Sequence, residues 1–235
     1  MPTIIKGQPT SAEVIDRLKA ENRPVLLAFS CGKDSIATWC ALEDAGIEVV
    51  PVYMYIVPHL DFVDDEIAYF EDRFSTRIRQ YPHASFYRLV GNAVSQAPER
   101  LPIIEACKVP QPKYEHIWGL IREELDMKGA WCADGVRASD SIVRRASFVR
   151  YGVMKRSKMK VSPIADWLKG EVMECIESHD IDLPIDYKLF GRSFDGIDYR
   201  FTAPLKKHLP EDYERLCEWF PMIEADIVRH EAYGI

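Results

Sequence analysis

An apolar run that leads through a short polar turn into a helical run constrains this chain most. The apolar run is 25–29 and the turn is 30–35. A buried strand that feeds a helix in this way aims backbone N–H groups and the positive helix end at one point. The turn adds a glycine, a lysine and two hydroxyl groups: Gly32, Lys33, Ser30 and Ser35. We therefore expect the loop 30–35, called here the phosphate loop, to bind a phosphate group.

The turn is not the common nucleotide P-loop. Leu27 stands where that pattern needs glycine, and Asp34 stands where it needs Ser or Thr. The loop instead resembles the PP-loop, S-G-G-K-D-S, of the adenine nucleotide α-hydrolase-like superfamily. Five of six positions match, and Cys31 replaces the first glycine. The resemblance implies binding of ATP or a related nucleotide, which many members cleave between the α- and β-phosphates. An ordinary strand-to-helix turn with an N-capping serine is the alternative.

Composition limits the classes of protein to consider. The chain has 235 residues, 47% hydrophobic residues and a formal net charge of −7. It is long enough for one large α/β domain, and no apolar run approaches the roughly 20 residues of a membrane span. Its six cysteines include no C-x-x-C pair, which disfavours a disulfide scaffold and a zinc ribbon. We expect a cytoplasmic protein without a membrane partner or a general attraction to nucleic acid.

Strand-like and helix-like runs alternate along the chain. Strands are expected at 25–29, 48–55, 85–90 and 130–134, and helices at 10–21, 35–45, 64–80, 113–128, 166–179 and 210–230. This order predicts an α/β fold with a three-layer, mainly parallel twisted sheet, helices on both faces (Rossmann-like, PP-loop type) and a C-terminal helical extension. We expect a nucleotide-binding domain over 1–180 and, packed on it, an extension over 181–235.

A second unusual segment, 134–145, follows the last predicted strand. It carries three arginines, Arg137, Arg144 and Arg145, and Asp140 is placed to orient one of them. Arginine forks bind phosphate and sulfate oxygens in pairs. Because ligands of such sheets bind beyond the carboxyl ends of the strands, this arginine segment and the phosphate loop are expected in one crevice. A solvated basic turn is the alternative.

The arginine segment also resembles that of the sulfonucleotide (PAPS/APS) reductase branch. Its G-x-R-x-x-x-S-x-x-R spacing is met by Gly135, Arg137, Ser141 and Arg144, and 160–172 resembles the branch's K-x-x-P-L-x-x-W-x-x-x-x-V segment. The resemblance spans roughly 20–190. The catalytic cysteine of the branch's C-terminal E-C-G-L-H tail is missing, however, and Cys217 fits a buried helical position. Reductive chemistry is therefore poorly supported.

The resemblance implies a set of site residues. Those expected to bind nucleotide are Ser30, Cys31, Gly32, Lys33, Asp34, Ser35, Gly135, Arg137, Ser141 and Arg145; those expected to act in catalysis are Lys33, Arg137 and Arg144. Asp34 is the candidate Mg²⁺ ligand, with pinning of the loop as an equal alternative. Cys31 is interpreted as a substitute for a small residue rather than as a nucleophile. By superfamily analogy, adenine is expected near 53–55.

The leading hypothesis is a PAPS-reductase-like PP-loop enzyme that binds ATP and Mg²⁺, adenylates an acceptor and releases pyrophosphate. The acceptor, a nucleic acid or a small metabolite, stays open, as does a homodimer or a partner protein. One alternative is a reductase or binding protein for PAPS that uses a partner's thiol; another is a non-catalytic adenine-nucleotide sensor. Segment 190–200 is expected to be a lid, a partner contact or a plain surface loop. Asp64 is expected to N-cap a helix.

Overall fold

The computed structural model describes residues 3–234. The chain divides into two compact units, each built from three stretches. Unit 1 comprises 1–53, 75–79 and 120–183, and unit 2 comprises 54–74, 80–119 and 184–235. The units are interleaved along the chain, and the predicted division into 1–180 and 181–235 stays a prediction.

A six-stranded sheet is the centre of the fold, with strand order β3-β2-β1-β4-β6-β5. Its strands are β1 (Val25–Phe29), β2 (Val49–Tyr55), β3 (Arg79–Pro82), β4 (Cys132–Ala133), β5 (Met154–Lys155) and β6 (Lys160–Val161). β1 runs parallel to β2 and β4, β4 runs parallel to β6, and β5 is antiparallel to β6. The predicted α/β class with a mainly parallel sheet is confirmed.

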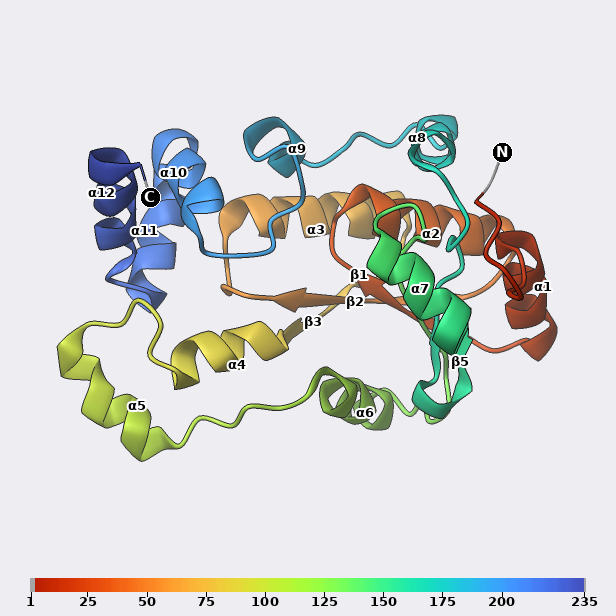
Figure 1. Cartoon of the computed structure of the whole chain (residues 1–235), viewed down its shortest axis with the longest axis horizontal. Coiled ribbons are helices and arrows are strands. Elements are labelled where there is room, and N and C mark those ends of the chain that lie inside the picture. Colours follow the sequence, from red (N-terminus) through yellow and green to blue (C-terminus); the bar gives the residue numbers. More distant parts are fainter. Residues whose placement is uncertain (1–2, 235) are drawn as a thin grey trace. The chain divides into compact units, whose positions relative to one another are not determined.

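Helices make up most of the remaining chain (Figure 1). They are α1 (Ser11–Glu21), α2 (Lys33–Asp44), α3 (Asp61–Arg73), α4 (Ala84–Gly91), α5 (Leu101–Cys107), α6 (Tyr114–Glu124), α7 (Ile142–Tyr151), α8 (Lys169–Ser178), α9 (Ile185–Leu189), α10 (Tyr199–His208), α11 (Pro210–Trp219) and α12 (Ile223–Tyr233), with 3₁₀ turns at Pro98–Arg100 and Arg156–Lys158. The C-terminal stretch is helical, as predicted.

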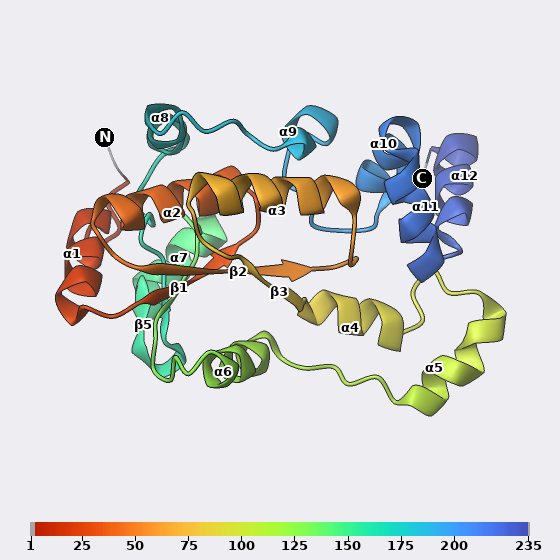
Figure 2. The ribbon, with the colours of Figure 1, turned by 180° about the vertical axis from the view of Figure 1, so that it is seen from behind.

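Helix α2 is the element that carries the phosphate loop into the core. It packs on β1, and α8 packs on α2 (Figures 1 and 2). Every residue from 35 to 42 is buried as a result. On the sheet's other face, Arg122 in the last turn of α6 donates hydrogen bonds to the carbonyl oxygens of Ala130 and Met159, both at 2.9 Å. Contacts with β1 and α8 thus hold α2 in the core.

Three predicted elements are wrong. The run 85–90 is not a strand: α4 covers it, and the strand is β3, which begins six residues earlier. β3 begins within the expected helix 64–80, which in the structure ends at Arg73. The aromatic residues of 85–90 suit either structure, but the His83 ring accepts a hydrogen bond from the N–H of Ser85 and so starts a helix. The expected helix 210–230 is two helices, because Pro221 lacks an N–H group and restricts Phe220 before it.

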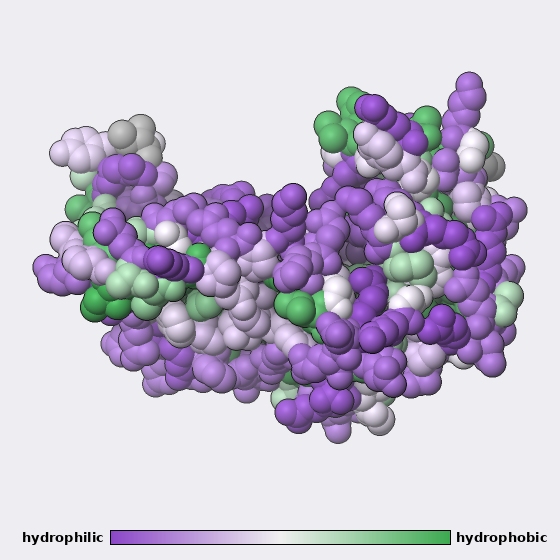
Figure 3. Space-filling model, turned by 90° about the horizontal axis from the view of Figure 1, so that it is seen from below, coloured by the Kyte–Doolittle hydropathy of each residue, from purple (hydrophilic) through white to green (hydrophobic). Residues whose placement is uncertain are grey.

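One face of the molecular surface is mostly polar (Figure 3). Hydrophilic residues dominate the face drawn in Figure 3, and hydrophobic residues occur there in small separate groups. Among the described residues, no helix combines the length and the apolar character that crossing a bilayer requires.

Candidate functional site

The phosphate loop and the arginine segment leave neighbouring strands of unit 1 in the same direction. The phosphate loop follows β1 and the arginine segment follows β4, and the two strands pair in parallel. From β1 the sheet grows through β2 to β3 on one side, whereas β4 lies on the other side. The strand order therefore reverses between β1 and β4. That reversal is where open α/β sheets bind ligands.

Hydrogen bonds inside the phosphate loop fix its shape. The buried hydroxyl of Ser35 donates to the carbonyl oxygen of Gly32 at 2.8 Å and accepts from the N–H of Ser30 at 3.2 Å. Gly32 is the N-cap of α2 and provides no side-chain cap. The N-capping serine of the alternative interpretation is therefore absent, and phosphate binding by this loop stays a prediction. The loop leads directly into the N-terminal end of α2, where the positive end of the helix dipole suits an anion.

Cys31 adopts a backbone conformation that favours glycine. Its φ is 55°, and its side chain is buried. The PP-loop motif that this loop resembles has glycine at this position, and glycine adopts a left-handed conformation without strain.

Another buried cysteine, Cys132 on β4, is unreactive. Burial raises the pKa of its thiol to about 12, so the thiol stays protonated and inert at neutral pH.

Asp34 joins the two segments electrostatically. One carboxylate oxygen, Oδ2, lies 2.5 Å from Nζ of Lys33, and the other, Oδ1, lies 2.9 Å from Nε of Arg137. The second contact is a charge contact, because its alignment is not that of a hydrogen bond. Asp34 thus pins the lysine of the phosphate loop and the first arginine at one place.

Arg137 is the most unusual side chain of the site. Only 6% of it is exposed, yet it carries a full charge. Its Nη2 donates to Oδ1 of Asp140 at 2.8 Å, and its backbone N–H donates to Oδ2 of the same residue at 3.1 Å. Its Nη1 is buried and has no hydrogen-bond partner among the described residues. A desolvated donor in this state costs free energy that an arriving anion removes.

The other arginines differ from one another. Arg144 is half-exposed, and its Nη1 lies 2.6 Å from Oδ2 of Asp140, so this aspartate contacts two arginines, where the sequence predicted one. Arg145 instead donates to the carbonyl oxygen of Ile4. Ser141 N-caps α7 by accepting the N–H of Arg144. Ion pairs therefore connect Lys33, Asp34, Arg137 and Arg144 in one network. Ser141 and Arg145 make their polar contacts outside this network.

Gly135 lies directly against the phosphate loop. A Cβ atom at Gly135 would be 2.5 Å from the carbonyl carbon of Asp34 and 2.6 Å from its oxygen. Only glycine permits this approach of two backbones. At Gly135 the two segments are therefore in direct contact, and the expected crevice between them is closed at this point.

Three site residues escaped the sequence prediction. Asp134, at the end of β4, lies 2.9 Å from Nζ of Lys160, and its other oxygen accepts a hydrogen bond from the Ser162 hydroxyl at 2.6 Å. The same oxygen accepts the N–H of Val136 and so bends the chain into the arginine segment. An aspartate at the carboxyl end of a buried strand was the available signal.

Mg²⁺ does not fit the carboxylates as they stand. Both oxygens of Asp34 face cations, and both oxygens of Asp134 are already engaged. A magnesium site usually needs one or two carboxylates that are available, together with phosphate oxygens and water. The pinning role of Asp34 agrees with the contacts, and we assign the metal no step.

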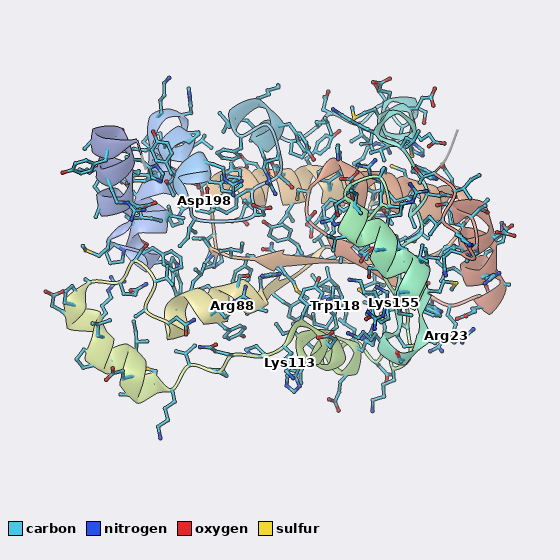
Figure 4. The ribbon with its side chains drawn as sticks, viewed as in Figure 1. Arg23, Arg88, Lys113, Trp118, Lys155 and Asp198 are labelled. Atoms are coloured by element: carbon cyan, nitrogen blue, oxygen red, sulfur yellow. The ribbon has the colours of Figure 1, made fainter. Side chains whose placement is uncertain are left out.

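Unit 2 holds the remaining candidates. Asp64 does not cap a helix: α3 begins at Asp61, and the buried carboxylate of Asp212 accepts the N–H groups of Asp61 at 2.5 Å and Phe62 at 3.3 Å. Segment 190–200 is tied to Asp186, which accepts the N–H of Phe194. At the end of that segment, Asp198 caps α10 (Figure 4). The role of 190–200 stays a prediction.

Comparisons with known proteins leave the family open. No family model and no curated protein matches the chain. A solved structure of NH3-dependent NAD synthetase from Campylobacter jejuni, in complex with nitrate, aligns over 96% of this chain and 95% of its own, with a TM-score of 0.48 and 12% identity.

Proposed function

We propose that this chain is a PP-loop enzyme that binds ATP and transfers its adenylyl group to an acceptor, releasing pyrophosphate. The observation that carries the proposal is the buried Arg137, whose unpartnered Nη1 accompanies a phosphate loop at the reversal point of the sheet. Arg137 lies next to Asp34 in the first turn of α2, so an anion that contacts this donor and the N-terminal end of α2 bridges the two segments. A polyphosphate chain has that form.

In this proposal, different residues bind different phosphates of ATP. The phosphate loop binds the β- and γ-phosphates, while Arg137 and Arg144, both oriented by Asp140, hold the α-phosphate. An acceptor atom attacks the α-phosphorus, the bond to the bridging oxygen breaks, and pyrophosphate leaves. Lys33 moves from Asp34 to the leaving oxygens and neutralises their growing charge. Positioning and electrostatics supply the rate, without a covalent enzyme intermediate.

Binding of nucleotide to the full chain is the first test. We expect Lys33→Ala to weaken ATP binding, measured by calorimetry, by roughly 10- to 100-fold, because one charge-assisted contact of about 1.5–3 kcal/mol is lost. Lys19→Ala, an exposed lysine of α1, is the control and should leave the affinity unchanged. Equal affinities for the wild type and Lys33→Ala would disprove the phosphate loop.

Turnover separates the proposal from its competitors. Pyrophosphate release from ATP, measured with candidate nucleic-acid and metabolite acceptors, supports adenylyl transfer. Tight binding of PAPS with no pyrophosphate under any condition would favour a sulfonucleotide protein. Binding of ATP without turnover would favour a sensor.

A further inference from the structure

A cluster of metal-ligand side chains lies between α2 and α8, apart from the nucleotide residues. Cys40 and Asp44 are four residues apart on α2. Cys175 and His179 are four apart on α8 and its C-cap. Side chains four apart share one face of a helix, and these two helices pack against each other. Four ligand-type residues are thus brought together in unit 1.

The distances within the cluster suit a small tetrahedral ion. The sulfur atoms of Cys40 and Cys175 and a ring nitrogen of His179 all lie within 4.8 Å of one another. Zinc–sulfur bonds of about 2.3 Å in a tetrahedron place two sulfurs roughly 3.8 Å apart. Small rotations of the three side chains would therefore bring all three ligand atoms to bonding distance from one ion.

The contacts of His179 supply an independent argument. Its Nδ1 lies 2.8 Å from the carbonyl oxygen of Cys175, and its Nε2 lies 3.0 Å from Oδ1 of Asp44. Donation from Nδ1–H leaves Nε2 of a neutral ring without a hydrogen, facing a carboxylate. Two such electron-rich atoms need a proton or a metal ion between them. A zinc-bound histidine with its other N–H on a backbone carbonyl has this arrangement.

We propose that Cys40, Cys175, His179 and Asp44 form a zinc site that clamps α2 to α8. Thiolate and imidazole ligands together select zinc among the common cellular divalent ions. Asp44, which is largely exposed, rotates to provide the fourth ligand. Both thiols lose their protons to solvent when the metal binds. The site is structural: it fixes the helix whose first turn belongs to the phosphate loop.

Zinc itself is the probe for the test. The full chain, purified under reducing conditions, is titrated with Zn²⁺ against a chromophoric chelator, and its metal content is measured by mass spectrometry. We expect one zinc per chain and a higher melting temperature with zinc. Cys175→Ala and His179→Ala should each lose about 100-fold or more in affinity, and Asp44→Asn roughly 10- to 100-fold.

One variant outside the cluster is the control, and two results would contradict the zinc site. Cys107→Ala removes an exposed thiol of α5 and should bind zinc like the wild type. Co²⁺ should give the absorption of tetrahedral thiolate ligation in the wild type but not in Cys175→Ala. Zinc affinity unaffected by Cys175→Ala in folded protein would overturn the proposal. So would a Cys40–Cys175 disulfide in metal-free protein isolated without oxidant. Neither readout needs nucleotide.

Discussion

Cys31 has a backbone conformation that is unfavourable for a residue with a side chain. It holds a left-handed φ of 55° with its side chain buried. A non-glycine residue in this region costs about 1–2 kcal/mol, and burying a small apolar side chain returns a similar amount. The residue is thus a compromise between strain and packing.

Substitutions at Cys31 should reveal these two terms. We expect Cys31→Gly to leave the free energy of unfolding nearly unchanged, since lost packing offsets relieved strain. Cys31→Val should lower it by about 2 kcal/mol, because a β-branched residue fits this region badly. Urea denaturation measures both. Equal stability of the two variants would refute the strain argument.

Gly135 tests the contact between the two segments. Its missing Cβ makes room for the backbone of Asp34. Gly135→Ala should force the segments apart, lower the free energy of unfolding by about 1–3 kcal/mol and weaken ATP binding at least tenfold. Gly119→Ala, in open surroundings on α6, is the control and should stabilise the chain by up to about 1 kcal/mol. ATP affinity retained by Gly135→Ala would contradict the close approach.

At the scale of elements, Asp140 connects the start of α7 to the phosphate loop through Arg137. Asp140→Asn leaves a buried guanidinium with weaker support, so we expect a loss of about 1–3 kcal/mol in the free energy of unfolding and weaker ATP binding. Asp226→Asn, which removes an exposed pair with Arg229, should cost under about 1 kcal/mol. Thermal melts and calorimetry compare the two variants, and equal effects would show that Asp140 has no special role.

Helix α3 depends on a cap from outside itself. The buried carboxylate of Asp212, on α11, accepts two N–H groups of its first turn. Asp212→Ala should therefore lower the free energy of unfolding by about 1–3 kcal/mol. Hydrogen exchange should show faster exchange at Asp61 and Phe62, and unchanged exchange there would refute the cap.

Sequence patterns predict those elements whose signals are local. Strand 25–29, the helix after the phosphate loop and the capped start at Ser11 follow from neighbouring residues and are confirmed. The strand order and the Asp212 cap depend on distant residues and could not be predicted. For the same reason, the spacing of Cys175 and His179 was visible in the sequence, but its pairing with α2 was not.

At the scale of the whole molecule, the interleaving of the units predicts a failed truncation. Within unit 2, Phe62 packs on Phe190 and Phe194, and Arg215 pairs with Asp61. A chain of residues 1–183 keeps Phe62 but loses these partners. We expect it to aggregate or to bind a dye for exposed apolar surface. A monomeric, cooperatively folded 1–183 fragment would show instead that 184–235 is dispensable.

The close approach of Gly135 to Asp34 has a consequence for the order of folding. It joins stretches that are far apart along the chain, and it exists only once β4 has paired with β1. Such non-local contacts form slowly, because loop closure precedes any gain. The ability to bind nucleotide should therefore arise late in refolding. A ligand that bridges both segments should then slow the unfolding rate far more than it speeds folding.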